Sequence, residues 1–256
     1  MKSKIAMANW KMHGDRATWR GLARGIANGT ATSGVDVVIC PPYPALADVE
    51  ETLKGTSVSL GAPNVHQFDK GAYTGEVSAP ILKEFGCKYV IIGHSERREY
   101  FGENNNLDLA EKIRQCIRHD LVPVYCVGET WQQREEGKTF TVLDEQLLDG
   151  LNDVYISMPD QLIVAYEPVW AISALIGERK KPTADDLKEV FRYMRQAMIA
   201  KYGELGHDIR LIYGGSVGES NVKSFMEVEG LNGVLVGGAS LDDKVFSDIV
   251  QKISEV

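Results

Sequence analysis

The chain has 256 residues, of which 44% are hydrophobic and 25% charged, the ordinary balance of a globular protein. Its net charge of −8 argues against a nucleic-acid partner, because nucleic-acid surfaces need clustered Lys and Arg. No stretch approaches the ~20 apolar residues of a membrane span, and the first residues carry too few apolar side chains for a signal peptide.

Eight short apolar runs alternate with longer amphipathic stretches along the chain. Several runs are apolar on consecutive residues, as expected of strands that are covered on both faces. The runs are residues 5–8, 35–40, 58–61, 89–93, 122–127, 162–166, 209–213 and 233–236.

The stretches between the runs carry apolar residues at helical spacing, which predicts amphipathic helices. Thr183 and Asp186 form a predicted capping box at the start of one of them. The predicted apolar stripes are Leu187, Val190, Phe191, Met194 and Met198; Leu109, Ile113, Cys116 and Ile117; and Val245, Ile249 and Ile253.

Strand–helix alternation repeated eight times predicts parallel strands with right-handed crossovers. We therefore expect one α/β domain over residues 1–256, a single (β/α)₈ barrel with outer helices, and about 250 residues is the usual length of that fold. An open doubly wound sheet is the alternative. That fold usually carries a G-x-G-x-x-G turn after an early strand, and the sequence contains none.

Residues with reactive side chains follow several of the predicted strands. In a barrel the active site lies at the carboxyl ends of the strands, so these residues would meet around one opening. The candidates are Asn9 and Lys11 after the first run, His94 and Glu96 after the fourth, and Glu167 after the sixth.

Glycine-rich loops follow the seventh and eighth runs, at residues 214–216 and 237–240. Glycine lets backbone N–H groups approach an anion closely, and this is the usual phosphate position in a (β/α)₈ barrel. A lysine, a histidine and a glutamate can together abstract a proton from carbon and stabilise the resulting oxyanion. The pattern predicts proton transfer on a small phosphorylated substrate.

Seven segments closely resemble the triosephosphate isomerase family, and they cover nearly the whole chain in the family's order. The two that contain His94 and Glu167 are long and highly specific. The segments are residues 9–12, 68–76, 91–98, 126–129, 165–172, 213–217 and 235–241.

The resemblance implies interconversion of dihydroxyacetone phosphate and glyceraldehyde 3-phosphate, a step of glycolysis and gluconeogenesis. It makes Glu167 the base and His94 the neutral electrophile, the arrangement known for this family. Lys11 would stabilise the enediolate and hold the phosphate, and Asn9 would position Lys11 and a substrate oxygen. Glu96 would support these catalytic residues without touching the substrate. No metal or organic cofactor is implied.

The resemblance also implies a phosphate site and a partner. Backbone N–H groups of Ser173, Ser216, Gly237 and Gly238 would bind the phosphate together with Asn9 and Lys11. The long polar segment at residues 67–76 would project into a second copy of the chain. Thr74, Glu76 and Arg98 are the predicted contacts of this homodimer.

The chain departs from the family pattern after Ile172, where residues 173–182 are longer and lack the usual glycines. Closure over the substrate would then be slower or less complete, with Gly177 as a relocated hinge. Residues 179–181 form a basic run there. Elsewhere Pro63 stands where Gln is common, and His13 where Asn is usual.

The altered loop leaves two alternatives to an active isomerase. The chain could be a catalytically weakened phosphate-binding barrel that serves as a sensor or scaffold. It could also be a different isomerase or an aldolase on the same barrel, and an aldolase would form a Schiff base through a lysine.

Four cysteines, Cys40, Cys87, Cys116 and Cys126, form no CxxC pair and lie near no histidine cluster. This predicts neither a disulfide framework nor a zinc site. Cys40 and Cys126 lie at the ends of apolar runs, where a buried free thiol is expected. The expected location is the cytoplasm.

Overall fold

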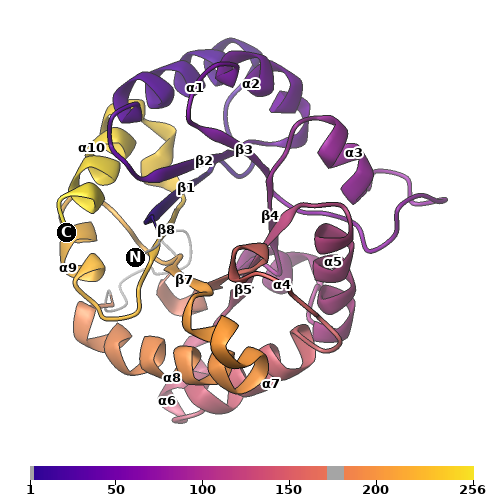
Figure 1. Cartoon of the computed structure of the whole chain (residues 1–256), viewed down its shortest axis with the longest axis vertical. Coiled ribbons are helices and arrows are strands. Elements are labelled where there is room, and N and C mark those ends of the chain that lie inside the picture. The colour runs from indigo at the N-terminus through magenta and orange to yellow at the C-terminus, as the bar shows by residue number, and fades with distance from the viewer. Residues whose placement is uncertain (1–2, 172–181) are drawn as a thin grey trace.

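A closed barrel of parallel strands forms the centre of the computed structural model, which describes residues 3–171 and 182–256. Within these residues eight strands pair in chain order, and the last pairs back onto the first (Figure 1). The predicted barrel is therefore confirmed, and the open sheet is excluded. The strands are β1 (Ile5–Asn9), β2 (Asp36–Cys40), β3 (Ser59–Ala62), β4 (Tyr89–Ile92), β5 (Val122–Val127), β6 (Ile163–Tyr166), β7 (Arg210–Tyr213) and β8 (Gly233–Val236).

Alternate residues of each strand face opposite layers of the core. In β1, Ile5 and Met7 belong to a cluster inside the barrel, whereas Ala6 and Ala8 belong to the cluster beneath the helices. Both faces are buried, which is why the runs are apolar on consecutive residues. The inner cluster contains Ile5, Met7, Val38, Cys40, Tyr89, Ile91, Val124, Cys126, Ile163, Ala165, Ile212 and Leu235.

Helices surround the barrel as an outer ring (Figure 1). In the described ranges the α-helices are α1 (Arg16–Thr30), α2 (Leu46–Leu53), α3 (Ala79–Glu84), α4 (Ser95–Phe101), α5 (Asn106–Arg118), α6 (Trp131–Glu135), α7 (Thr139–Gly150), α8 (Ala184–Tyr202), α9 (Val222–Met226) and α10 (Asp243–Ser254). Short 3₁₀ turns are η1 (Tyr43–Ala45), η2 (Pro159–Gln161), η3 (Val169–Ala171), η4 (Gly203–His207) and η5 (Gly238–Leu241).

The sequence patterns for α8 are confirmed. Thr183 and Asp186 form the predicted capping box, which satisfies N–H groups that the first helical turn leaves unpaired. All five residues of the predicted stripe are buried. In α10 the buried face is shifted, because Phe246 is fully buried where Val245 is only partly so.

The fourth strand is one residue shorter than predicted. It ends at Ile92 because Gly93 has a φ of +69°, a left-handed conformation that favours glycine and turns the chain into α4. The four cysteines are free and buried, which confirms the prediction for Cys40 and Cys126. Among residues 3–171 and 182–256, no helix has both the length and the apolar content that crossing a membrane requires.

Closure of the barrel generates the first prediction. A Cβ on Gly233 would collide with the backbone carbonyl oxygen of Ile5, across the β8–β1 pair. Because a backbone atom cannot turn aside as a flexible side chain can, Gly233→Ala should lower the free energy of unfolding by about 3 kcal/mol. Gly21→Ala is the matched control. No atom lies within 4 Å of a Cβ at that position in α1, and this change should raise stability by about 0.5–1 kcal/mol.

Urea denaturation at one fixed protein concentration measures both values. Equal stability of the two variants would contradict the view that the close β8–β1 approach requires glycine.

Candidate active site

Five strands deliver candidate residues to the same end of the barrel. Asn9 is the last residue of β1, His94 lies two residues past β4, and Glu167 directly follows β6. Ser216 and Gly237 lie just beyond β7 and β8. Parallel strands all end at one rim, so residues far apart in sequence are brought together there.

Glu167 is the most enclosed charged group of the site, with 2% of its surface exposed. One carboxylate oxygen accepts a hydrogen bond from the Ser95 N–H at 3.3 Å, and the other lies 3.3 Å from His94 Nε2. A Cβ on Gly214 would lie 2.5 Å from Glu167 Cγ. The carboxylate therefore occupies its position only because β7 is followed by glycine.

His94 stands at the N-terminus of α4 as its N-cap residue. Its Nδ1 accepts a hydrogen bond from the Glu96 N–H at 3.2 Å, so Nδ1 carries no proton in this arrangement. The proton of a neutral ring is then on Nε2, the nitrogen that faces Glu167.

Lys11 and Glu96 form an ion pair across the opening of the barrel, with Nζ and Oε1 2.5 Å apart. The backbone of Lys11 has a φ of +52°, and its N–H donates to Asn9 Oδ1 at 3.0 Å. A left-handed conformation costs a non-glycine residue about 1–2 kcal/mol, and such strain concentrates at functional sites. Asn9 thus holds Lys11 in a conformation that it would not adopt unaided.

Glycines after β8 lie beside this lysine. A Cβ on Gly237 would be 3.5 Å from Lys11 Nζ, and Gly238 follows it at the start of η5. Ser216 is half-buried after β7, and its carbonyl oxygen accepts a hydrogen bond from Asn221 Nδ2 at 2.9 Å. This part of the rim combines an ammonium group with glycine backbone, as an anion site requires.

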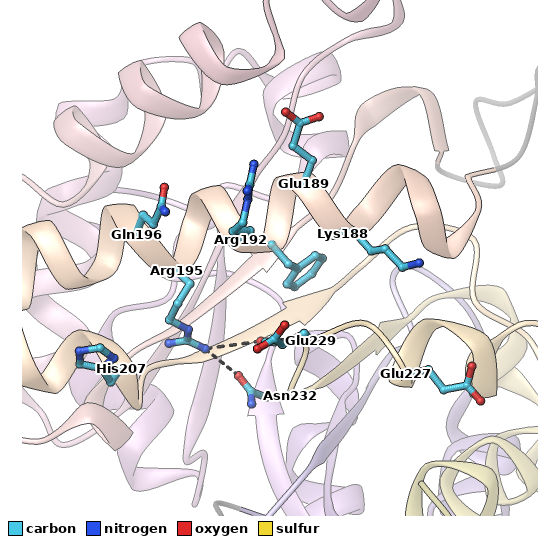
Figure 2. Close-up of a pocket in the computed structure, with 11 residues that line it drawn as sticks. Lys188, Glu189, Arg192, Arg195, Gln196, His207, Glu227, Glu229 and Asn232 are labelled. Atoms are coloured by element: carbon cyan, nitrogen blue, oxygen red, sulfur yellow. Dashed lines mark hydrogen bonds between the residues drawn. The ribbon is translucent and has the colours of Figure 1, made fainter.

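A cavity of about 940 Å³ lies elsewhere, between α8, η4 and the segment before β8 (Figure 2). Charged side chains of both signs line it, and most of them are exposed. Arg195 donates to the carbonyl oxygens of Gly206 and Ile209, both at 2.7 Å, and to Asn232 Oδ1 at 3.1 Å. These bonds join three chain segments, so we assign Arg195 a structural role and place the chemistry at the strand ends.

The family model described as triosephosphate isomerase matches residues 4–253. The chain belongs to the triosephosphate isomerase family. It is 43% identical over 250 residues to the triosephosphate isomerase of Moorella thermoacetica, with 98% of each chain covered. Identity is also 43% over 253 residues to that of Carboxydothermus hydrogenoformans, which covers 98% of this chain and 99% of the relative. The crystal structure of the Bartonella henselae enzyme superposes with a TM-score of 0.89 at 37% identity, covering 98% of this chain and 99% of that one.

The remaining predicted residues of this triosephosphate isomerase family member differ in where they lie. Ser173, Gly177 and residues 179–181 of the altered loop fall outside the described residues. Thr74 and Glu76 are exposed on the segment that projects between β3 and α3, at the right of Figure 1. Arg98 bonds within its own chain, to the Gly93 and Cys126 carbonyl oxygens at 2.8 and 3.2 Å.

Sequence reasoning missed the surroundings of the Glu167 carboxylate. Cys126, predicted only as a buried thiol, packs against it inside the barrel, and burial followed by the Glu167 charge raises the pKa of that thiol well above its ordinary value. The thiol is therefore a neutral neighbour. The alternation of side chains along a strand was the available signal. Cys126 is two residues from Val124, so both side chains face the barrel interior.

The hydrogen bond at Nδ1 predicts the tautomer of His94. In ¹⁵N spectra of the folded protein at neutral pH, His94 should show an unprotonated Nδ1 and a protonated Nε2, because Nδ1 is occupied by the Glu96 N–H. His13, which is exposed, serves as the reference ring in the same spectra. Two protonated nitrogens on His94 would contradict this description of the site.

Proposed function

We propose that this chain interconverts dihydroxyacetone phosphate and glyceraldehyde 3-phosphate, with Glu167 as the base. The observation that carries the proposal is the 3.3 Å approach of Glu167 to His94 Nε2 in a site almost closed to water. A carboxylate and an N–H donor at this separation can act on one carbon and on the oxygen beside it.

In this mechanism Glu167 takes a proton from the carbon next to the carbonyl, while the Nε2–H of His94 donates to the carbonyl oxygen. The intermediate is an enediolate, in which His94 moves the hydroxyl proton from one oxygen to the other. Return of the first proton from Glu167 to the adjacent carbon then completes the exchange. Lys11 carries a positive charge at the same rim and stabilises the negative oxygen. Glu96 holds the Lys11 ammonium between turnovers, and Asn9 fixes the Lys11 backbone.

Backbone N–H groups of Ser216, Gly237 and Gly238 are the proposed phosphate contacts, with Lys11 as the charged partner. The nearness of Gly237 to Lys11 Nζ supports this assignment. Ser173 remains a proposed contact on the resemblance alone. The mechanism uses one base and one electrophile, so we propose that the reaction needs neither a metal nor an organic cofactor.

The relatives at about 40% identity over the full chain support the isomerase and not a weakened phosphate-binding barrel. A barrel that had lost catalysis would be expected to lose a reactive side chain. Here Glu167, His94, Lys11, Glu96 and Asn9 are all present, with mutual contacts that suit the reaction.

We also propose a homodimer in which Thr74 and Glu76 enter the partner. Arg98 would support this interface through its hydrogen bonds within its own chain. Large apolar side chains are exposed in the segments that follow β1, β3 and β4. These strands belong to the first half of the barrel, β1 to β4. Met12 is 93% exposed, and a group of exposed apolar side chains marks an interaction surface. Of the exposed apolar side chains after these strands, we assign Met12, Phe68, Tyr73, Tyr100 and Phe101 to the interface.

The whole chain would act as one domain. Its four free, buried cysteines suit a reducing compartment, and we propose the cytoplasm on that ground.

Shortening the base tests the proposed reaction. Glu167→Asp withdraws the carboxylate by about 1 Å, which should lower kcat about 100-fold or more, because a displacement of that size can cost 10²-fold. Isomerisation of glyceraldehyde 3-phosphate, coupled to an NADH-dependent reductase, measures the rate. Glu189→Asp on the exposed face of α8 is the control and should leave kcat unchanged. Negligible turnover of the wild type, with phosphate-analogue binding retained, would instead favour the binding barrel.

Substitution at the projecting segment tests the homodimer. Sedimentation of the wild type should give a mass of two 28.3 kDa chains. Thr74→Arg should weaken association at least about tenfold, since it places an unpaired charge in the interface. Leu148→Arg, at a residue 66% exposed on α7, is the control and should not change the mass. A monomeric wild type, or a shift caused by Leu148→Arg alone, would contradict this interface.

A further inference from the structure

Arg134 occupies a junction near the proposed base that the mechanism above does not use. It lies on the short helix α6, and 27% of its side chain is exposed. Within the described ranges its guanidinium contacts Glu129 Oε1 at 3.4 Å, Asp186 Oδ1 at 3.0 Å, and the face of the Trp170 ring at 4.5 Å from the centroid. A planar guanidinium can bond two carboxylates and stack on an indole at once, as an ammonium group cannot.

The first partner, Glu129, is a fully buried carboxylate. It accepts hydrogen bonds from the Tyr166 hydroxyl at 3.0 and 3.1 Å and from Trp170 Nε1 at 2.9 Å. Burial, and then the charge of Glu129, raise the pKa of the Tyr166 hydroxyl well above its usual range, so this hydroxyl remains a donor. A buried carboxylate that lacks a cation is costly, and Arg134 is the cation in contact with it.

Tyr166 and Trp170 lie on either side of Glu167 in the chain. Tyr166 directly precedes the base and Trp170 follows it by three residues, in η3. Both donate to the same Glu129 carboxylate, so the backbone that carries Glu167 is fixed from both sides. The Val169 N–H also donates to the Glu129 carbonyl oxygen at 3.0 Å.

The second carboxylate partner, Asp186, follows residues 172–181 in the sequence. Its other oxygen accepts from the N–H and the hydroxyl of Thr183, at 2.8 and 2.7 Å, in the capping box of α8. Arg134 therefore joins the chain that leaves Glu167 to the beginning of α8. The ion pairs Arg134–Glu129 and Arg134–Asp186 share one guanidinium.

We propose that Arg134 is a positioning residue for Glu167. As the shared counter-ion of Glu129 and Asp186, it holds Tyr166 and Trp170 and thereby sets where the base stands relative to His94. This inference rests on the proposed isomerase activity and adds a residue to it. Among the described residues, the contacts of Arg134 are with Glu129, Asp186 and Trp170 and include neither Glu167 nor a proposed phosphate contact, so its effect belongs in kcat rather than in substrate binding.

The test compares Arg134→Gln, Arg134→Lys and Arg114→Gln with the wild type in the full-length protein. Arg114 is the matched control: it lies on α5, 31% of its side chain is exposed, and it bonds Glu111 and the Asn152 carbonyl oxygen away from the site. Steady-state isomerisation gives kcat and KM, calorimetry with glycerol 3-phosphate gives phosphate-analogue binding, and thermal unfolding gives Tm.

Arg134→Gln should lower kcat about tenfold, since a displaced base loses transition-state stabilisation, with KM and analogue affinity changed less than about threefold. Its Tm should fall by no more than about 4 °C, as expected for a partly exposed ion pair. Arg134→Lys keeps the charge and should recover part of the lost kcat. Arg114→Gln should keep kcat within about twofold of the wild type.

A kcat within about twofold of the wild type for Arg134→Gln would overturn the proposal. So would equal losses in Arg114→Gln. An inactive wild type would instead remove the proposed function itself, which keeps the two failures distinct.

A double-mutant cycle tests whether the two carboxylates share one cation. Asp186→Asn keeps an oxygen for the Thr183 capping box but loses the charge that faces Arg134. The double variant should then be no slower than Arg134→Gln alone, because the second change removes a contact already lost. Additive losses would mean that Asp186 acts independently of Arg134 and would overturn the shared counter-ion.

Discussion

Closure of the barrel by the β8–β1 pair is the constraint on which the site depends. Once the last strand pairs with the first, every strand must end at the same rim. Asn9 from β1 and Gly237 beyond β8 then become neighbours, although more than 200 residues separate them in the sequence. The close approach of Gly233 to the Ile5 carbonyl oxygen makes this pairing possible. The absence of a Cβ at Gly233 therefore allows the β8–β1 pairing that fixes the arrangement of the whole rim.

Enclosure of charge is the second feature that organises the molecule. Glu167 is buried, and within residues 3–171 and 182–256 its carboxylate meets the Ser95 N–H, His94 and the neutral Cys126 thiol. The nearby Glu129 is also buried but is paired with Arg134. The two carboxylates therefore suit different tasks: the proposed base faces His94, and Glu129, paired with Arg134, holds the chain around it.

Local chemistry and packing agree in the elements that support the site. The capping box of Thr183 and Asp186 starts α8, and the same Asp186 bonds Arg134. His94 caps α4 with Nδ1, which leaves Nε2 facing Glu167. The residues that cap the N-termini of α4 and α8 thus also orient side chains at or near the site. A substitution at either cap would therefore change the position of these side chains.

The sequence by itself determined the eight strands to within about a residue, the buried stripe of α8 and the motifs that carry Glu167 and His94, because periodicity and capping are local properties. It did not determine that Cys126 packs on Glu167, that Gly214 leaves room for the carboxylate, or that Arg134 joins Glu129 to Asp186. Those contacts join residues from different strands and helices. Only the closed barrel brings them together, because distance along the chain carries no information about which side chains meet at its rim.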